Sequence, residues 1–302
     1  MKKNSLIILL FSLITTIAFA QDEAAEKDAP VYLPFESGSL IDAQTTEIPD
    51  VKTLEFVIQH KFGTIENGIS DLWGLYSSAN IRLGINYVPY KNIQLGVGLN
   101  KSHMTTDLNA KWTILEQTEK NTVPVAVALY GNVGIDGRPI SGYSNDSVQV
   151  GYTGSVGEIK FPDRLSYFAQ LIVGRKFNEH LSLQAGVSFS HYNIADLGYD
   201  HDKIGVHFNG RIKVTTQGSI IFNYDQPLKI KSISENREWT TKNDPKPNIA
   251  FGYEVSTGAH AFQIYMGTTN YILPQETMMM NASSFDNKGL SFGFVITRLW
   301  YH

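Results

Sequence analysis

The fold is decided by two neighbouring stretches, Ile81-Arg82-Leu83-Gly84-Ile85-Asn86-Tyr87 and Ile93-Gln94-Leu95-Gly96-Val97-Gly98-Leu99. In both, large apolar residues alternate with polar residues or glycine, so that an extended chain has one apolar face and one polar face. Soluble β-sandwiches alternate in the same way, so the pattern predicts strands without deciding their surroundings. The surroundings are indicated by how often the pattern recurs and by what precedes it.

The alternating pattern recurs along the chain from residue 53 to the C-terminus. Long connections at 63–75, 134–164, 191–202, 226–247 and 269–287 alternate with short turns. This combination predicts an all-β protein, a transmembrane antiparallel up-and-down β-barrel of about 12 strands. An even number of strands leaves the N- and C-termini on the short-turn side, which is periplasmic in such barrels. The expected strands are 53–62, 76–88, 91–101, 107–117, 123–133, 165–177, 180–190, 203–215, 217–225, 248–256, 259–268 and 288–301.

The N-terminus has the features of an export signal. Lys2 and Lys3 precede an apolar run that ends in Ala18-Phe19-Ala20, a small-residue cleavage site. We therefore expect a signal peptide at 1–20, an N-terminal periplasmic or lumen-associated segment at 21–52, and an outer-membrane β-barrel at 53–302. The expected location is the outer membrane of a Gram-negative cell, reached after export.

Composition excludes several function classes. The chain contains no Cys, which rules out disulfides and thiol catalysis. Its formal net charge of −4 becomes more negative when the two signal-peptide lysines are removed, so a nucleic-acid partner is not expected. The expected partners are outer-membrane lipid, the outer-membrane assembly machinery, and an outer-membrane or periplasmic protein. The aromatic end of the last strand, Trp300-Tyr301, resembles the signal that the assembly machinery recognises.

The strand phase also predicts which residues contact lipid. Leu83, Ile85, Leu95, Val97 and Leu129 are among those expected on the outer face. Aromatic residues near strand ends are typical of the interfacial girdles of membrane barrels. In this chain they are Tyr87, Tyr90, Trp112, Tyr167, Tyr224 and Trp300.

The region 54–116 resembles a known family. It contains Leu54-Glu55-Phe56-Val57-Ile58-Gln59-His60-Lys61-Phe62-Gly63, followed by Asn80-Ile81-Arg82-Leu83-Gly84 and Lys111-Trp112. This run is similar to an uncharacterised Bacteroidetes outer-membrane β-barrel family of unknown function, in which Arg is usual where Lys61 stands. The resemblance implies the fold and the location. It carries no established activity and no functional residues, and a fold alone does not imply a function.

The polar face of the strands gives the first candidate site, because it should line the lumen. An excess of basic residues there favours a narrow pore for anions or small polar solutes. The same residues are equally compatible with a hydrogen-bonded interior that seals the barrel, and both interpretations stay open. The lumen-lining candidates are Glu55, Lys61, Arg82, Lys111, His207, Arg211, Lys213, Asp225 and Glu254.

The loop 191–202 is the densest cluster of potential catalytic groups. An Asp–His pair at the rim of a barrel can activate water, and the same groups can bind a divalent cation. The rim-loop candidates are His191, Asp196, Asp200, His201 and Asp202. A solvated extracellular loop is the simpler explanation of this composition, so we expect no catalytic residue, no metal and no cofactor.

The leading hypothesis is therefore a barrel without enzymatic activity that serves as a small-solute pore or as an accessory subunit of a surface complex. The alternatives are a membrane-embedded hydrolase or lipid-modifying enzyme with a site at the rim, a sealed structural barrel, and a soluble periplasmic β-protein.

Overall fold

The computed structural model describes residues 28–143, 148–150, 159–196, 199–230, 233, 244–286 and 288–301. The predicted signal peptide at 1–20 lies outside the described residues. So do residues 21–27 and parts of the predicted long connections 134–164 and 226–247. Among the described residues, no helix has both the length and the apolar character needed to cross a membrane.

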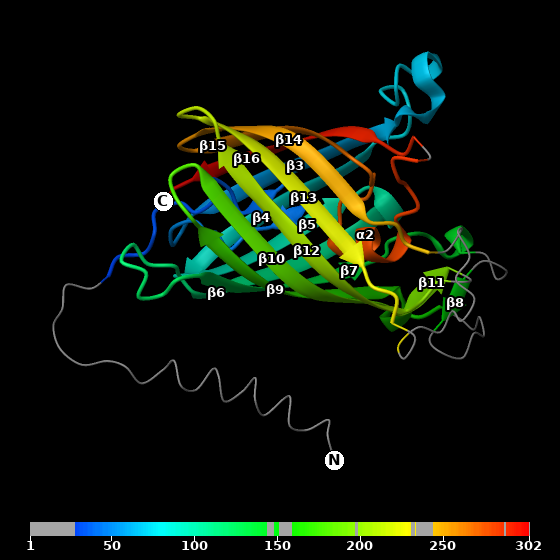
Figure 1. Ribbon diagram of the computed structural model, residues 1–302. Helices are drawn as coiled ribbons and strands as arrows, with labels where there is room; N and C mark the ends of the chain where they lie inside the picture. The colour runs from blue at the N-terminus through cyan, green and yellow to red at the C-terminus, as the bar shows by residue number, and fades with distance from the viewer. Residues whose placement is uncertain are drawn as a thin grey trace.

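The prediction of a 12-stranded antiparallel barrel is confirmed (Figure 1). Each strand pairs with its neighbour along the barrel, and the last strand closes on the first through the pair Trp300–Leu54. The strands are β3 (Leu54–Thr64), β4 (Asn80–Tyr90), β5 (Ile93–Asn100), β6 (Thr105–Leu115), β7 (Ala126–Ile135), β9 (Leu165–Lys176), β10 (Leu181–Tyr192), β12 (Asp202–Lys213), β13 (Gly218–Pro227), β14 (Asn248–Thr257), β15 (His260–Gly267) and β16 (Ser291–Trp300).

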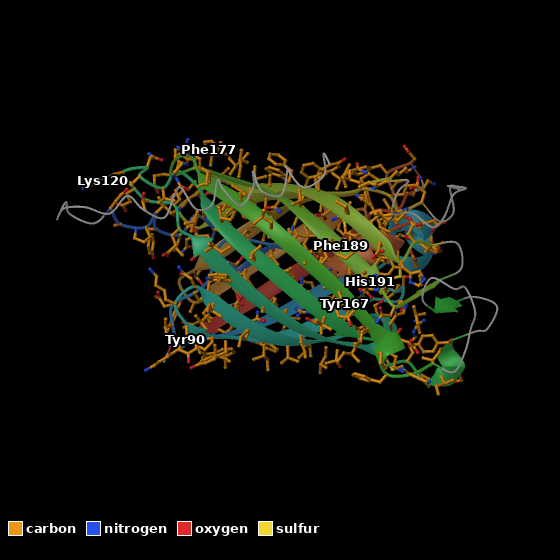
Figure 2. All side chains as sticks on the ribbon, turned by 90° about the horizontal axis from the view of Figure 1, so that it is seen from below. Tyr90, Lys120, Tyr167, Phe177, Phe189 and His191 are labelled. Carbon is orange, nitrogen blue, oxygen red and sulfur yellow. The ribbon has the colours of Figure 1, made fainter. Side chains whose placement is uncertain are left out.

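The two faces of the wall differ as the alternation requires. Leu95 is 51% exposed on the outside, whereas its neighbour Gln94 is 3% exposed inside. Side chains project outward along the whole wall, with Tyr90 near one end and Tyr167 near the other (Figure 2). The wall therefore has an apolar outer surface and a polar lining, which is how a barrel buries its polar groups away from lipid.

Both described chain ends lie at one end of the barrel, where most connections are short; we call it the turn end (Figure 1). Most long connections lie at the opposite, loop end. The alternation is broken on both sides of β6. Its loop-end connection to β5 is only 101–104, and its turn-end connection to β7 spans 116–125.

The long turn-end connection has a structural reason, because it holds the N-terminal segment. Val31 donates its N–H to the Gln117 carbonyl at 2.8 Å, and Glu119 donates to Ala29 at 2.9 Å. The Asp28 carboxylate accepts from the Lys120 backbone N–H at 2.8 Å. Desolvation raises the pKa of Asp28, but hydrogen bonds from Thr118, Lys120 and Thr122 outweigh it and lower the pKa to about 2.

Two inserts fill the interior of the barrel. From the turn end, residues 28–52 enter the lumen and form a hairpin of β1 (Ser39–Leu40) and β2 (Ala43–Gln44). From the loop end, the β15–β16 connection folds inward and forms α2 (Pro274–Met280), which lies inside the barrel (Figure 1). We call residues 28–52 the N-terminal insert and residues 268–281 the α2 insert.

Each insert packs on apolar side chains that point inward from the wall. Phe35, Leu40 and Ile41 of the N-terminal insert form a buried cluster with Val57, Ile221, Ala250, Tyr265 and Val295. Met278 of α2 packs with Ala128, Tyr130, Phe168 and Ile172. Burial of such surface contributes about 25 cal/mol per Å², so both inserts are held by packing as well as by polar contacts.

Smaller elements lie around the loop end. The 3₁₀ segments are η1 (Ile65–Asp71), η2 (Ser102–Met104), η3 (Ile140–Gly142) and η5 (Pro162–Arg164). A separate two-stranded sheet pairs β8 (Val148–Val150) with β11 (Ile194–Asp196). These elements lie beyond the barrel wall and frame its loop-end rim.

Candidate functional site: the barrel interior

The lumen-lining candidates lie inside the barrel. Eight of them are less than 9% exposed: Glu55, Lys61, Arg82, Lys111, His207, Arg211, Asp225 and Glu254. Lys213, at the end of β12, is only half-buried because it lines a cavity of about 950 Å³ at the turn end.

Lys61 lies where the two inserts meet. Its ammonium forms an ion pair with Asp42 at the tip of the N-terminal hairpin. The same nitrogen donates to the backbone carbonyls of Thr269 at 3.1 Å and Tyr271 at 2.6 Å in the α2 insert. A buried ammonium needs such partners to offset its desolvation. Lys61 therefore fixes both inserts to the wall.

Arg211 and Lys111 also bind the N-terminal insert. The Arg211 guanidinium donates to the Glu36 carboxylate at 2.9 Å, and Glu254 of the neighbouring wall lies 3.9 Å away. The Lys111 ammonium donates to the Gly38 carbonyl at 3.0 Å. Three cations of the wall are thus bound by acceptors that belong to the insert.

Arg82 differs, because its partner is part of the wall. Its Nε and Nη2 donate to the two oxygens of Asp107 at 2.7 Å each. Asp107 also accepts from the Asn132 amide at 2.9 Å. This bidentate geometry is the strongest form of an arginine–carboxylate contact.

The predicted excess of inward bases does not hold for the filled lumen. Asp107 was not among the predicted lumen residues, although it has the same strand phase as Asn109 and Lys111. The acids that the inserts bring inside, Glu36, Asp42 and Glu276, were not predicted there either. The wall alone carries the basic excess, and the inserts offset it.

The α2 insert is held by polar contacts at its start. Gln275 donates to the Asn132 side-chain oxygen at 2.7 Å, and Asn100 donates to Glu276 at 3.1 Å. Below α2, a cavity of only about 20 Å³ separates Met278 from His207 and the N-terminal hairpin. The two inserts therefore meet near the middle of the barrel and leave room for about one water molecule between them.

Three polar residues of adjacent strands form a hydrogen-bonded relay beside this cavity. His207 Nδ1 lies 2.7 Å from an Asp225 oxygen, and His207 Nε2 lies 2.7 Å from the Ser188 hydroxyl. The other Asp225 oxygen accepts from the amides of Asn223 and Asn248, at 2.8 Å each. From the sequence, His207 and Asp225 were predicted to line the lumen, whereas Ser188 was not.

The rim-loop candidates are only partly brought together. His191 contacts Asp202 at 2.7 Å and Asn193 at 2.7 Å, and its ring lies 6.4 Å from that of His201. Asp200 pairs with Lys203 at 2.6 Å. Asp196 belongs to β11, and its side chain is outside the description. Within the described part of the chain, no group of three or more His, Cys, Asp or Glu side chains is arranged to hold a metal ion.

One sequence signal for the inserts was overlooked. Val57, Tyr130, Phe168, Ile172 and Val295 occupy inward positions of their strands, where a water-filled lumen favours polar residues. Apolar residues at lumen positions indicate that something packs on them. Their positions could have predicted a filled barrel, although not which segments fill it.

Comparison with known proteins places this geometry in a family. A family model described as a membrane bound beta barrel domain matches residues 35–300. The chain belongs to this family. The match covers the wall, the α2 insert and residues 35–52 of the N-terminal insert, so the lumen contacts of Glu36, Gly38 and Asp42 lie within the family domain.

Known structures with a similar architecture share little sequence with this family member. The NanC porin is 6% identical with a TM-score of 0.49, covering 82% of this chain and 100% of its own. An outer membrane channel from Pseudomonas putida F1 is 11% identical with a TM-score of 0.46, covering 84% and 97%. The KdgM porin is 6% identical with a TM-score of 0.41, covering 83% and 99%. No curated protein matches the chain. At such identities, function does not transfer.

Proposed function

We propose that this protein is an outer-membrane channel for small anionic solutes, closed in the described state by the N-terminal insert and the α2 insert. The proposal rests on one observation. Wall cations Lys61, Arg211 and Lys111 are bound by Asp42, Glu36 and the Gly38 carbonyl, all of which belong to a segment that enters from the turn end.

A sealed structural barrel has no need of such an arrangement. In such a barrel, the wall cations could form permanent ion pairs with carboxylates of the wall, as Arg82 does with Asp107. Where the partners belong to an insert, withdrawal of the insert takes one acceptor away from each of these cations and leaves the lumen with more positive charge. A confined lumen of one sign raises the local concentration of ions of the opposite sign. The insert carboxylates would then occupy the places that solute anions take in the open channel.

The orientation belongs to the same proposal. The turn end, with both described chain ends, would face the periplasm, as in bacterial barrels with short periplasmic turns. Protease added to intact cells should cleave within 134–164 or 226–247 and spare 178–180. Cleavage that requires rupture of the outer membrane would overturn this orientation.

Planar-bilayer recording tests the channel. The full-length mature protein should conduct rarely, whereas a variant lacking residues 28–50 should open frequently. Heat-modifiable gel migration verifies that the deletion variant is still a folded barrel. Absence of conductance both in the folded deletion variant and in the same variant with α2 (Pro274–Met280) also removed would contradict the proposal and favour a sealed structural barrel.

Single carboxylates give a finer version of the same test. Asp42→Asn removes the charge that pairs with Lys61 and should raise the ratio of open to closed states about tenfold or more, since a hydrogen bond to a charged group contributes about 1.5–3 kcal/mol. Asp50→Asn is the matched control, because Asp50 is in the same segment but exposed at the mouth. Equal effects of the two substitutions would mean that the Lys61 contact does not hold the insert.

A further inference from the structure

Ser188, His207 and Asp225 are hydrogen-bonded in the order that a nucleophilic serine, a general base and an orienting carboxylate adopt in serine hydrolases. Asp225 receives the amides of Asn223 and Asn248, so its carboxylate is held as an acceptor toward His207. The proton of a neutral imidazole then lies on Nδ1, facing Asp225. Nε2 is left with its lone pair toward the Ser188 hydroxyl at 2.7 Å. This tautomer is the one that accepts a proton from serine.

The strand register builds the relay from three adjacent inward positions. His207 is directly opposite Asp225 across the β12–β13 pair, and Ser188 is opposite Gly205 across the β10–β12 pair. Gly205 leaves the space through which the serine reaches the imidazole. A Cβ at that position would lie 2.9 Å from the Ser188 oxygen and 2.4 Å from the Met278 sulfur. Any larger residue would therefore disturb both the relay and the α2 insert.

The relay lies beside the cavity between the inserts. Gln170, directly opposite Ser188 across the β9–β10 pair, lines this cavity together with His207, Thr277 and Met278. It carries a side-chain amide, which is a group that can donate a hydrogen bond to the oxyanion of a tetrahedral intermediate on Ser188. Met278 covers the cavity from the α2 side and packs against Phe168.

We propose that Ser188 is the nucleophile of a lumenal esterase site, with His207 as its general base, Asp225 as a positioning residue and Gln170 as the oxyanion donor. The Ser188 oxygen attacks the carbonyl carbon of an ester while His207 takes the hydroxyl proton. The ester C–O bond breaks, and His207 returns the proton to the leaving alcohol. Water then attacks the acyl-serine with His207 as base, which releases a carboxylic acid and restores Ser188.

The size of the site indicates the substrate class. A cavity of about 20 Å³ accommodates a group the size of one water molecule, and the flexible Met278 side chain is its most adaptable boundary. An acyl group therefore has to displace the Met278 side chain, which restricts it to the smallest groups such as acetyl, and its polar alcohol enters through the lumen when the inserts move. This activity goes beyond conduction and does not depend on the charge of the conducted solute.

Covalent labelling of the purified full-length barrel tests the assignment. Methanesulfonyl fluoride, a serine-directed reagent whose methyl group matches an acetyl-size site, should modify Ser188, as located by peptide mass mapping, and the label should be lost in Ser188→Ala. Ser190→Ala is the matched control, because Ser190 is buried on the same strand and face, and it should leave the labelling unchanged. Met278→Ala should increase the labelling rate by widening the cavity.

Ester hydrolysis gives a second readout. The barrel should hydrolyse p-nitrophenyl acetate in preference to p-nitrophenyl octanoate, and His207→Gln should lower the rate about 10²-fold or more, as expected for loss of a general base. The absence of label at Ser188 in both the wild type and Met278→Ala, each verified as folded by heat-modifiable migration, would overturn the assignment. The relay would then serve only to link β10, β12 and β13. Neither outcome bears on whether the deletion variant conducts.

Discussion

Arg82 and Arg211 face the lumen from opposite sides of the barrel, yet their charges are neutralised by different kinds of partner. Arg82 on β4 binds Asp107 on β6 with two hydrogen bonds, and Asp107 is fully buried. Arg211 on β12 binds Glu36 on the N-terminal insert, whose side chain is 19% exposed. The first pair joins parts of the wall, whereas the second joins the wall to a segment that enters it.

The difference separates what the barrel needs to fold from what it needs to close. A buried pair within the wall has no state in which its partners separate except unfolding, so its loss is a loss of stability. A pair between wall and insert separates whenever the insert leaves, so its loss shifts an equilibrium between two folded states. The two arginines should therefore respond differently to removal of their carboxylates.

The largest effect is expected for the wall pair. Asp107→Ala leaves the Arg82 guanidinium buried without its bidentate partner, which should lower the free energy of unfolding by about 3–5 kcal/mol. Glu36→Ala should lower it by about 1 kcal/mol or less, because the pair is partly exposed to water. Denaturant unfolding in detergent micelles, followed by tryptophan fluorescence, measures both. Equal losses would contradict the distinction between the two pairs.

A second comparison concerns the two faces of one strand. Leu95→Arg places a charge on the lipid-facing side of β5 and should cost about 2–4 kcal/mol if this position lies near the middle of the membrane. Gln94→Arg points inward, where the Gln94 amide already donates to Glu55 at 2.8 Å, so the new cation meets a carboxylate. The same unfolding measurement should show the smaller loss for Gln94→Arg. The reverse order would mean that the strand phase is wrong by one residue.

The wall could be predicted from the sequence because its signal is local. Alternation within about ten residues decides which face of each strand meets lipid, and all twelve strands occur where the pattern indicates them. Element ends differ by a few residues, as expected where turns fray into strands. The distribution of long and short connections fails only around β6, where residues 116–125 lengthen to bind residues 28–31.

The interior could not be predicted to the same degree because its contacts are distant in sequence. Nothing in the sequence around Asp42 indicates that it pairs with Lys61. The seven residues of α2 are too few to show a helical pattern. Ser188 is one serine in a strand that contains several, and only the register of three strands brings it to His207. Composition suggested a catalytic site in the loop 191–202 instead, because His and Asp residues are dense there. In the structure these residues form local pairs, such as His191 with Asp202 and Asp200 with Lys203.

The difference between the wall pair of Arg82 and the insert pair of Arg211 should have its smallest effect on the ion selectivity of the open barrel. In the variant lacking 28–50, Lys61, Lys111 and Arg211 lose the acceptors that the insert supplies, whereas Arg82 keeps Asp107. The open lumen should therefore prefer anions, and Arg211→Gln in this background should weaken that preference.

Lys91→Gln is the control for this substitution, because the Lys91 side chain is 68% exposed at the mouth. Reversal potentials in a KCl gradient measure the preference. The difference between Arg211→Gln and Lys91→Gln should shrink in about 1 M salt, where the screening length falls to about 3 Å. Cation selectivity of the deletion variant would show that the negative charge of the wall acids Glu55, Asp225 and Glu254 exceeds the effect of the bases that lost their insert partners. The insert carboxylates would then not occupy the binding positions of a solute anion.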